Sequence, residues 1–322
     1  MYKLLSGLLL IIPSFVEAHT RWFAYGELEP VTDPNHNLYL SVWAVIIVFV
    51  VCIGIYLHQK NIFRLSFLRP SAKHAYDRAA STFAMVSGTF LLIAGTHEYL
   101  FSPNLNLESG ISYSFLVLEI IIGIAFILGI GTRTSALMLA LMWLLLFPTV
   151  GAVSALEDIW VLSTALFILI MGNDYFSLIG FTILGKVFRR FRPYALSILR
   201  LGTGVTLMVL GFSEKILAPE LGLNFLKQYD WNFMSQFGFS DYLFTISAGA
   251  VEFTLGLVFV LGIVTRLNAL VTAIIFTIPL FILGPIELAG HIPHFAAVIL
   301  LLLFGNGGKF LIFKSYNDAR VK

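Results

Sequence analysis

The chain has 322 residues, of which 58% are hydrophobic and 12% are charged, and its formal net charge is +2. Soluble domains carry about twice that share of charged residues, so the composition excludes a soluble fold and predicts an all-α protein that crosses a membrane several times. The sequence has no phosphate-binding glycine loop and no G-x-S-x-G motif, which argues against nucleotide, nucleic-acid and hydrolase sites. Cys52 is the single cysteine, so the chain cannot form an intramolecular disulfide or a redox-active cysteine pair.

Residues 1–18 have the pattern of a secretory signal peptide. Lys3 precedes an apolar run, Leu4–Phe15, that is too short to span a bilayer, and Val16-Glu17-Ala18 offers a cleavage site. An uncleaved anchor is the alternative. Residues 19–40 are polar and contain two prolines, so we expect them to form an extracytoplasmic arm.

Nine apolar segments of roughly membrane length follow the arm, beginning with a first transmembrane helix at 41–58. Several are shorter than the ~20 residues that cross a bilayer unaided, so they must tilt or be shielded inside a bundle. The other eight lie at about 79–101, 113–131, 134–150, 158–175, 194–217, 242–263, 268–286 and 292–305.

The loops between these segments alternate between basic and acidic. This alternation predicts that the basic side is cytoplasmic, with the arm outside and the C-terminus inside a bacterial inner membrane. The basic side carries Arg64, Arg69, Lys73, Arg78, Arg133, Lys186, Arg189, Arg190, Arg192, Arg266, Lys309, Lys314, Arg320 and Lys322. The opposite loops carry Glu108, Glu157, Asp158, Glu220, Asp230 and Asp241.

The second half of the chain repeats the first. Residues 118–137 and 251–270 align without gaps and are identical at 10 of 20 positions. The repeat predicts two four-helix bundles, unit 1 at 75–180 and unit 2 at 194–314, joined by a basic linker at 186–193 and followed by a cytoplasmic tail at 315–322. Because both units begin on the same side, they are parallel repeats about an axis along the membrane normal.

Unit 2 contains several distinctive motifs: Arg200-Leu201-Gly202, Gly211-Phe212-Ser213-Glu214-Lys215, the E-x-x-x-G to T-R run from Glu252 to Arg266, and the late histidines His291 and His294. In these motifs unit 2 resembles the DoxX family of bacterial membrane proteins. Unit 1 resembles the family more weakly, and the arm and the first helix lie outside the resemblance. Unit 1 has Ala84 in place of Arg200 and Asp158 in place of His291. Members of the family include the membrane subunit of thiosulfate:quinone oxidoreductase, so the resemblance implies quinone as ligand and redox-complex subunits as partners.

Several ionisable residues are candidates for a ligand or proton site. Glu119 and Glu252 lie within apolar helices, where a carboxylate must be paired, protonated or next to a polar cavity. Either of them can instead bond a neighbouring helix and serve packing alone. We expect His97, Glu98, Glu214 and Lys215, together with the late histidines, near the outer face, where they could line one outward-opening pocket. Arg200 is expected either to snorkel to the cytoplasmic headgroups or to pair with a buried acid.

The histidines also allow a metal site. Cleavage after Ala18 would leave His19 as the N-terminus, and its amino group and imidazole can together chelate copper. His36, His291 or His294 could complete such a site from the same side of the membrane. The alternative for His291 and His294 is that they are solvated interface residues. For His19 the alternative is chance, since some residue must follow the cleavage site.

Three functions therefore remain open, and the sequence does not decide whether the protein is an enzyme. The leading hypothesis is a subunit of a membrane redox complex that binds quinone or a small solute. The second is a transporter or copper-handling protein that uses an outward-facing pocket. The third is a structural membrane subunit without chemistry of its own.

Overall fold

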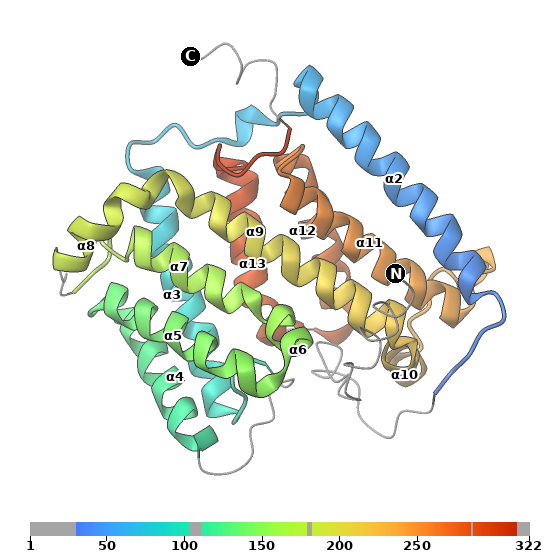
Figure 1. The fold of residues 1–322 in the computed structure, drawn as a ribbon, viewed down its shortest axis with the longest axis horizontal. Coiled ribbons are helices and arrows are strands. Elements are labelled where there is room, and N and C mark those ends of the chain that lie inside the picture. Colours follow the sequence, from blue (N-terminus) through green and yellow to red (C-terminus); the bar gives the residue numbers. More distant parts are fainter. Residues whose placement is uncertain (1–29, 103–110, 179–181, 285, 314–322) are drawn as a thin grey trace, which may run out of the picture.

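The computed structural model describes residues 30–102, 111–178, 182–284 and 286–313, and within these ranges it is helical and contains no strand (Figure 1). The long helices are α2 (His36–Lys60), α3 (Ala75–Thr96), α4 (Ile111–Leu128), α5 (Thr132–Val150), α7 (Ile159–Met171), α9 (Arg192–Leu210), α11 (Asp241–Leu261), α12 (Thr265–Leu283) and α13 (Ile286–Phe304). The short elements are η2 (Ser66–Leu68), α6 (Ala152–Glu157), α8 (Thr182–Phe188), η3 (Arg189–Phe191), η4 (Gly211–Leu217), α10 (Pro219–Tyr229) and η5 (Ser235–Phe237).

The long helices confirm the predicted all-α, polytopic membrane fold. Four spans are long and apolar enough to cross a bilayer, and five shorter apolar helices accompany them in the described part of the chain. The predicted segments match these helices to within a few residues. The first helix begins at His36 rather than at 41. Just before it, the carboxylate of Asp33 accepts the backbone N–H of Asn35 at 2.7 Å. Most of the arm and the whole signal segment lie outside the described residues.

The helix contacts support the predicted parallel repeat. Within unit 1, α3 packs on α4 and α5 packs on α7; within unit 2, α9 packs on α11 and α12 packs on α13. Between the units, α7 packs on α9 and α3 packs on α13. Exchanging each helix for its equivalent in the other unit reproduces the same contacts, as expected for a pseudo-two-fold axis. The additional helix α2 packs on α11 at one edge of the molecule, while α4 and α5 lie at the opposite edge (Figure 1).

Glycine pairs set how closely the first two helices of each unit approach. A Cβ atom on Gly256 of α11 would lie 2.5 Å from the carbonyl oxygen of Gly204 on α9. In unit 1, a Cβ on Gly88 would lie 2.6 Å from the carbonyl oxygen of Gly123. At these two crossings, backbone meets backbone, a contact that small residues permit between membrane helices.

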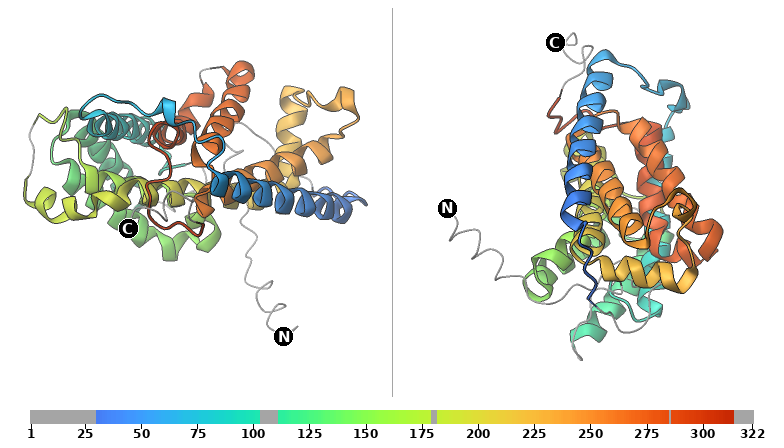
Figure 2. Two further views of the ribbon diagram at one scale, coloured as in Figure 1. Left: turned by 90° about the horizontal axis from the view of Figure 1, so that it is seen from above. Right: turned by 90° about the vertical axis from the view of Figure 1, so that its right-hand side faces the viewer.

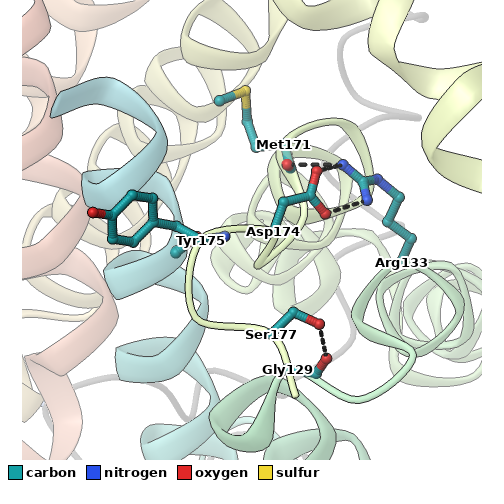
Figure 3. A network of polar contacts seen from close by, with 7 residues as sticks. Gly129, Arg133, Met171, Asp174, Tyr175 and Ser177 are labelled. Carbon is teal, nitrogen blue, oxygen red and sulfur yellow. Dashed lines mark hydrogen bonds and ion pairs between the residues drawn. The ribbon is translucent and has the colours of Figure 1, made fainter. Parts of the chain in front are cut away.

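The Thr-Arg pairs close the basic end of each unit. Figure 3 shows that the guanidinium of Arg133 bonds both carboxylate oxygens of Asp174, at 2.6 and 2.8 Å, and the carbonyl of Met171 at 2.9 Å. The same loop is fixed where the hydroxyl of Ser177 donates to the carbonyl of Gly129 at 2.6 Å. Its equivalent in unit 2, Arg266, donates to the carbonyl of Leu302 at 3.1 Å instead. Each arginine thus satisfies carbonyls at the end of the last helix of its own unit.

The glycine crossing gives a stability prediction. We expect Gly256→Ala to destabilise the protein by about 1–3 kcal/mol, because its Cβ meets backbone atoms that cannot rotate away. Thermal unfolding of the purified protein in detergent measures the effect. Gly54→Ala is the matched control, since its Cβ would meet only the flexible end of the Ile263 side chain, at 3.1 Å. Equal melting temperatures for the two variants would show that the crossing is not tightly constrained.

Candidate functional site

The central feature of unit 2 is an ion pair inside the bundle. The ammonium of Lys215 lies 2.8 Å from a carboxylate oxygen of Glu252, and the two side chains are 19% and 22% exposed. Glu252 comes from the middle of α11, and Lys215 from η4, a π-helical segment that continues α9. Single π turns are rare and occur frequently at functional sites.

Two glycines bring these charges together. A Cβ on Gly211 or on Gly249 would lie 2.6 Å from the carbonyl oxygen of the other, and one on Gly249 would also lie 2.7 Å from the Cβ of Lys215. Only glycines therefore allow η4 to cross α11 at this height. The π-helix begins at this crossing, and from it the side chain of Lys215 extends to the carboxylate of Glu252.

In unit 1 the equivalent carboxylate, Glu119, has different surroundings. Its helix α3 ends at Thr96, where unit 2 enters the π-helix, and Tyr99 stands at the position of Lys215. Glu119 is 0% exposed and accepts the backbone N–H of Phe101 at 3.2 Å. Among the described residues, no donor reaches its second oxygen. Glu119 is thus enclosed by protein, whereas Glu252 is half-buried beside a cavity.

The Lys215–Glu252 pair borders a cavity of about 480 Å³. Its polar wall also includes His291 and His294, which lie one helical turn apart on α13. The remaining lining is mostly apolar and comes from α2, α9, α10, α11, α12 and the segment between α10 and α11. The aromatic members are Trp43, Phe225, Trp231, Phe233, Phe239, Phe244 and Phe276.

Aromatic residues of α10 and of the loop between α10 and α11 form one side of this cavity. They include Phe225, Trp231 and Phe233. Their rings contact one another and Phe244 of α11, with centroids 5.2 Å apart for Phe233 and Phe244. Figure 2 shows α10 and this loop, in gold and light orange, projecting beside α11. Edge-to-face aromatic contacts of this kind hold the loop against the bundle.

The structure places some of the predicted pocket residues around this cavity and others elsewhere. Lys215, His291 and His294 share the cavity with Glu252. His97 and Glu98 do not join them; they are exposed at the end of α3 in unit 1. Glu214 is fully buried within the π-helix rather than on the cavity wall.

Two further acids are buried where the sequence predicts solvated loop charges. The carboxylate of Asp158 accepts the hydroxyl of Ser102 at 2.9 Å and the indole N–H of Trp160 at 3.1 Å. Glu157 accepts the hydroxyl of Ser213 at 2.6 Å. The ring of Trp160 also lies 5.3 Å from that of His294, so this buried polar cluster adjoins the wall of the cavity. In the sequence, the signal that could have indicated this buried polar cluster is the alignment of Asp158 with His291 in the repeat.

Arg200 follows neither of its predicted alternatives. Its fully buried guanidinium donates to the carbonyls of Phe259 and Val260 at the end of α11. It also donates to the carbonyls of Asn306, Lys309 and Phe310 in the turn after α13. Five backbone oxygens thus take the place of a headgroup or an acid, and Arg200 joins three helices at the basic end, away from the Lys215–Glu252 pair.

The described residues contain no group of three histidines, cysteines or acids placed to hold a metal ion. His36 forms a hydrogen bond with the hydroxyl of Tyr242, at 2.9 Å, and does not line the cavity. His19 lies outside the described residues, so the proposed N-terminal copper site stays a prediction. The ring centroids of His291 and His294 lie 6.3 Å apart.

Comparison with known families gives one match. The family model DoxX matches residues 195–284, which run from α9 to the end of α12 and include Lys215 and Glu252. The match is narrower than the resemblance seen in the sequence, since unit 1 and the histidines of α13 lie outside it. No curated protein and no solved structure matches the chain.

The ion pair gives a double-mutant prediction. Lys215→Met and Glu252→Gln should each destabilise the protein, and the double variant should lose about 1 kcal/mol less than the sum, because each single change removes the opposite charge from beside a half-buried one. Melting temperatures in detergent give the coupling. Lys227 is exposed on α10, so Lys227→Met combined with Glu252→Gln should be additive. Additivity in both cycles would mean that the pair contributes nothing.

Proposed function

We propose that this chain, whose residues 195–284 form a DoxX domain, is a membrane protein that binds a quinone or a similar apolar small molecule in unit 2. The observation that carries the proposal is a mostly apolar cavity, lined in part by aromatic side chains, with an ion pair on its wall. Its volume of about 480 Å³ falls within the range of small-molecule sites, which combine an apolar lining with a few polar groups.

The chemistry of the lining suits a ring that carries oxygen atoms at its edge. The ammonium of Lys215 can donate to a carbonyl oxygen of the ligand, and the carboxylate of Glu252 can accept a hydroxyl proton. His291 can do either, because its ring nitrogens donate or accept according to the tautomer. The aromatic side chains supply faces and edges on which a planar ring packs. A ligand that gains or loses protons at its oxygens would thus find groups for both states.

The proposed role in a redox complex depends on partners. The sequence has no cysteine pair, no haem-attachment motif and no flavin motif, so electrons would reach the ligand from another subunit. The same cavity could instead pass a solute through the bilayer, which is the transporter alternative. Uptake of the ligand into vesicles that contain the protein alone would favour that alternative.

The proposed location is a bacterial inner membrane, with the cavity near the outer surface. The contacts support one basic end: Arg266 donates to the carbonyl of Arg64, and Arg192 pairs with Asp77. His36 and Tyr242 meet at the other end. By the positive-inside rule, the basic end would be cytoplasmic.

Reporter fusions test this orientation. Alkaline phosphatase is active only outside the cytoplasm, so we expect an active enzyme when it is fused after Asn224 and an inactive one after Arg190. Matched fusions to a reporter that works only in the cytoplasm serve as the control and should give the opposite pattern. Activity at Arg190 and none at Asn224 would place the cavity near the inner surface.

Ligand binding tests the function. We expect the purified chain in lipid nanodiscs to bind a short-tailed benzoquinone, and Glu252→Gln to raise its Kd about tenfold, the equivalent of one charge-assisted hydrogen bond. Glu119→Gln is the matched control, since Glu119 is enclosed in unit 1 and should leave the Kd unchanged. Equilibrium dialysis with radiolabelled quinone measures both. If the wild-type chain binds no quinone, the proposed function is wrong.

A further inference from the structure

Helix α2 lies outside the matched DoxX domain, and yet it supplies part of the cavity wall. Trp43 of α2 lines the cavity together with Ser247 and Glu252 of α11. The indole N–H of Trp43 donates to the hydroxyl of Ser247 at 3.1 Å. One of the aromatic walls of the cavity is therefore contributed by a helix that the internal repeat does not contain.

Three polar contacts fasten α2 along the length of α11. His36 bonds the hydroxyl of Tyr242 at 2.9 Å near the start of α11, and Trp43 bonds Ser247 at the level of the cavity. Near the other end, the ring of His58 accepts the backbone N–H of Val264, at 3.3 Å. Gly54 is the buried residue of α2, and most of its other side chains are exposed to the bilayer region. Figures 1 and 2 show α2, in blue, lying along α11 at the edge of the bundle.

This arrangement places the indole of Trp43 on the α2 side of the cavity. Polar contacts within apolar surroundings fix the position of a helix more precisely than apolar packing does. The bond to Ser247 holds the indole of Trp43 in one place, so its bulk limits the room for a ligand ring beside α11. A smaller side chain at this position would widen the cavity towards α2.

We propose that Trp43 is a specificity-determining residue, which adapts the cavity to a single-ring ligand and disfavours a fused two-ring ligand. The inference rests on the proposed function, because it concerns the ligand of the same cavity. It assigns to α2 a part in ligand selection, in addition to its part in crossing the membrane.

The test compares two probes on the full chain in nanodiscs, a short-tailed benzoquinone and a naphthoquinone with the same tail. Wild-type protein should bind the benzoquinone more tightly. Trp43→Ala should weaken benzoquinone binding about tenfold through lost ring contact and weaken naphthoquinone binding less, so that the preference shrinks or reverses. Trp43→Phe, which keeps a ring but loses the N–H, should fall between the two and guards against misfolding of the alanine variant.

The control is Phe49→Ala, which removes an aromatic ring from the exposed surface of α2, where Phe49 is 64% exposed. It should leave both Kd values unchanged. An unchanged preference in both Trp43 variants, with binding intact or weakened equally for the two probes, would overturn the inference and leave the proposed function standing. Failure of the wild-type chain to bind either probe would overturn both.

Discussion

The close crossing of α9 and α11 is the constraint on which the rest of unit 2 depends. At Gly204 and Gly256 the two backbones touch, and about two turns further on, where α9 continues into η4, they touch again at Gly211 and Gly249. Since no side chain separates the helices, α9 can continue into the π-helix directly against α11. The ion pair of Lys215 and Glu252 follows from that contact. A single Cβ on Gly249 would collide with Lys215 itself, so the scaffold and the site are determined by the same residues.

The two units share a helical scaffold but give the equivalent carboxylate different surroundings. Unit 1 keeps the glycine crossing at Gly88 and Gly123 and keeps the carboxylate, Glu119. It has Tyr99 in place of the lysine, and α3 ends where unit 2 forms its π-helix. The backbone N–H of Phe101 donates to Glu119 instead. Unit 1 also provides Trp160, whose ring lies against His294 and whose N–H binds Asp158. Unit 1 therefore supports the wall of the unit 2 cavity rather than duplicating it.

Much of the architecture could be predicted from the sequence, because membrane-length apolar segments and an internal repeat are strong signals. The repeat pointed to Glu252, and the resemblance to the DoxX family pointed to Lys215, His291 and His294. The π-helix could not be predicted, since nothing in Gly211–Leu217 distinguishes it from an α-helix. The burial of Glu157 and Asp158 was hidden because their neutral donors, Ser213 and Ser102, lie about fifty residues away in the chain. The partners of Arg200 could not be predicted because they are backbone carbonyls, which every residue carries.

The most direct measurement is an experimental structure of the protein purified from its own membrane in mild detergent, without added ligand. The account predicts ring-shaped density in the unit 2 cavity, between Trp43 and the Lys215–Glu252 pair, with a polar edge within hydrogen-bond reach of Lys215 or His291. A cavity closed by the aromatic loop, with the same ion pair but room for no more than ordered water, would contradict it.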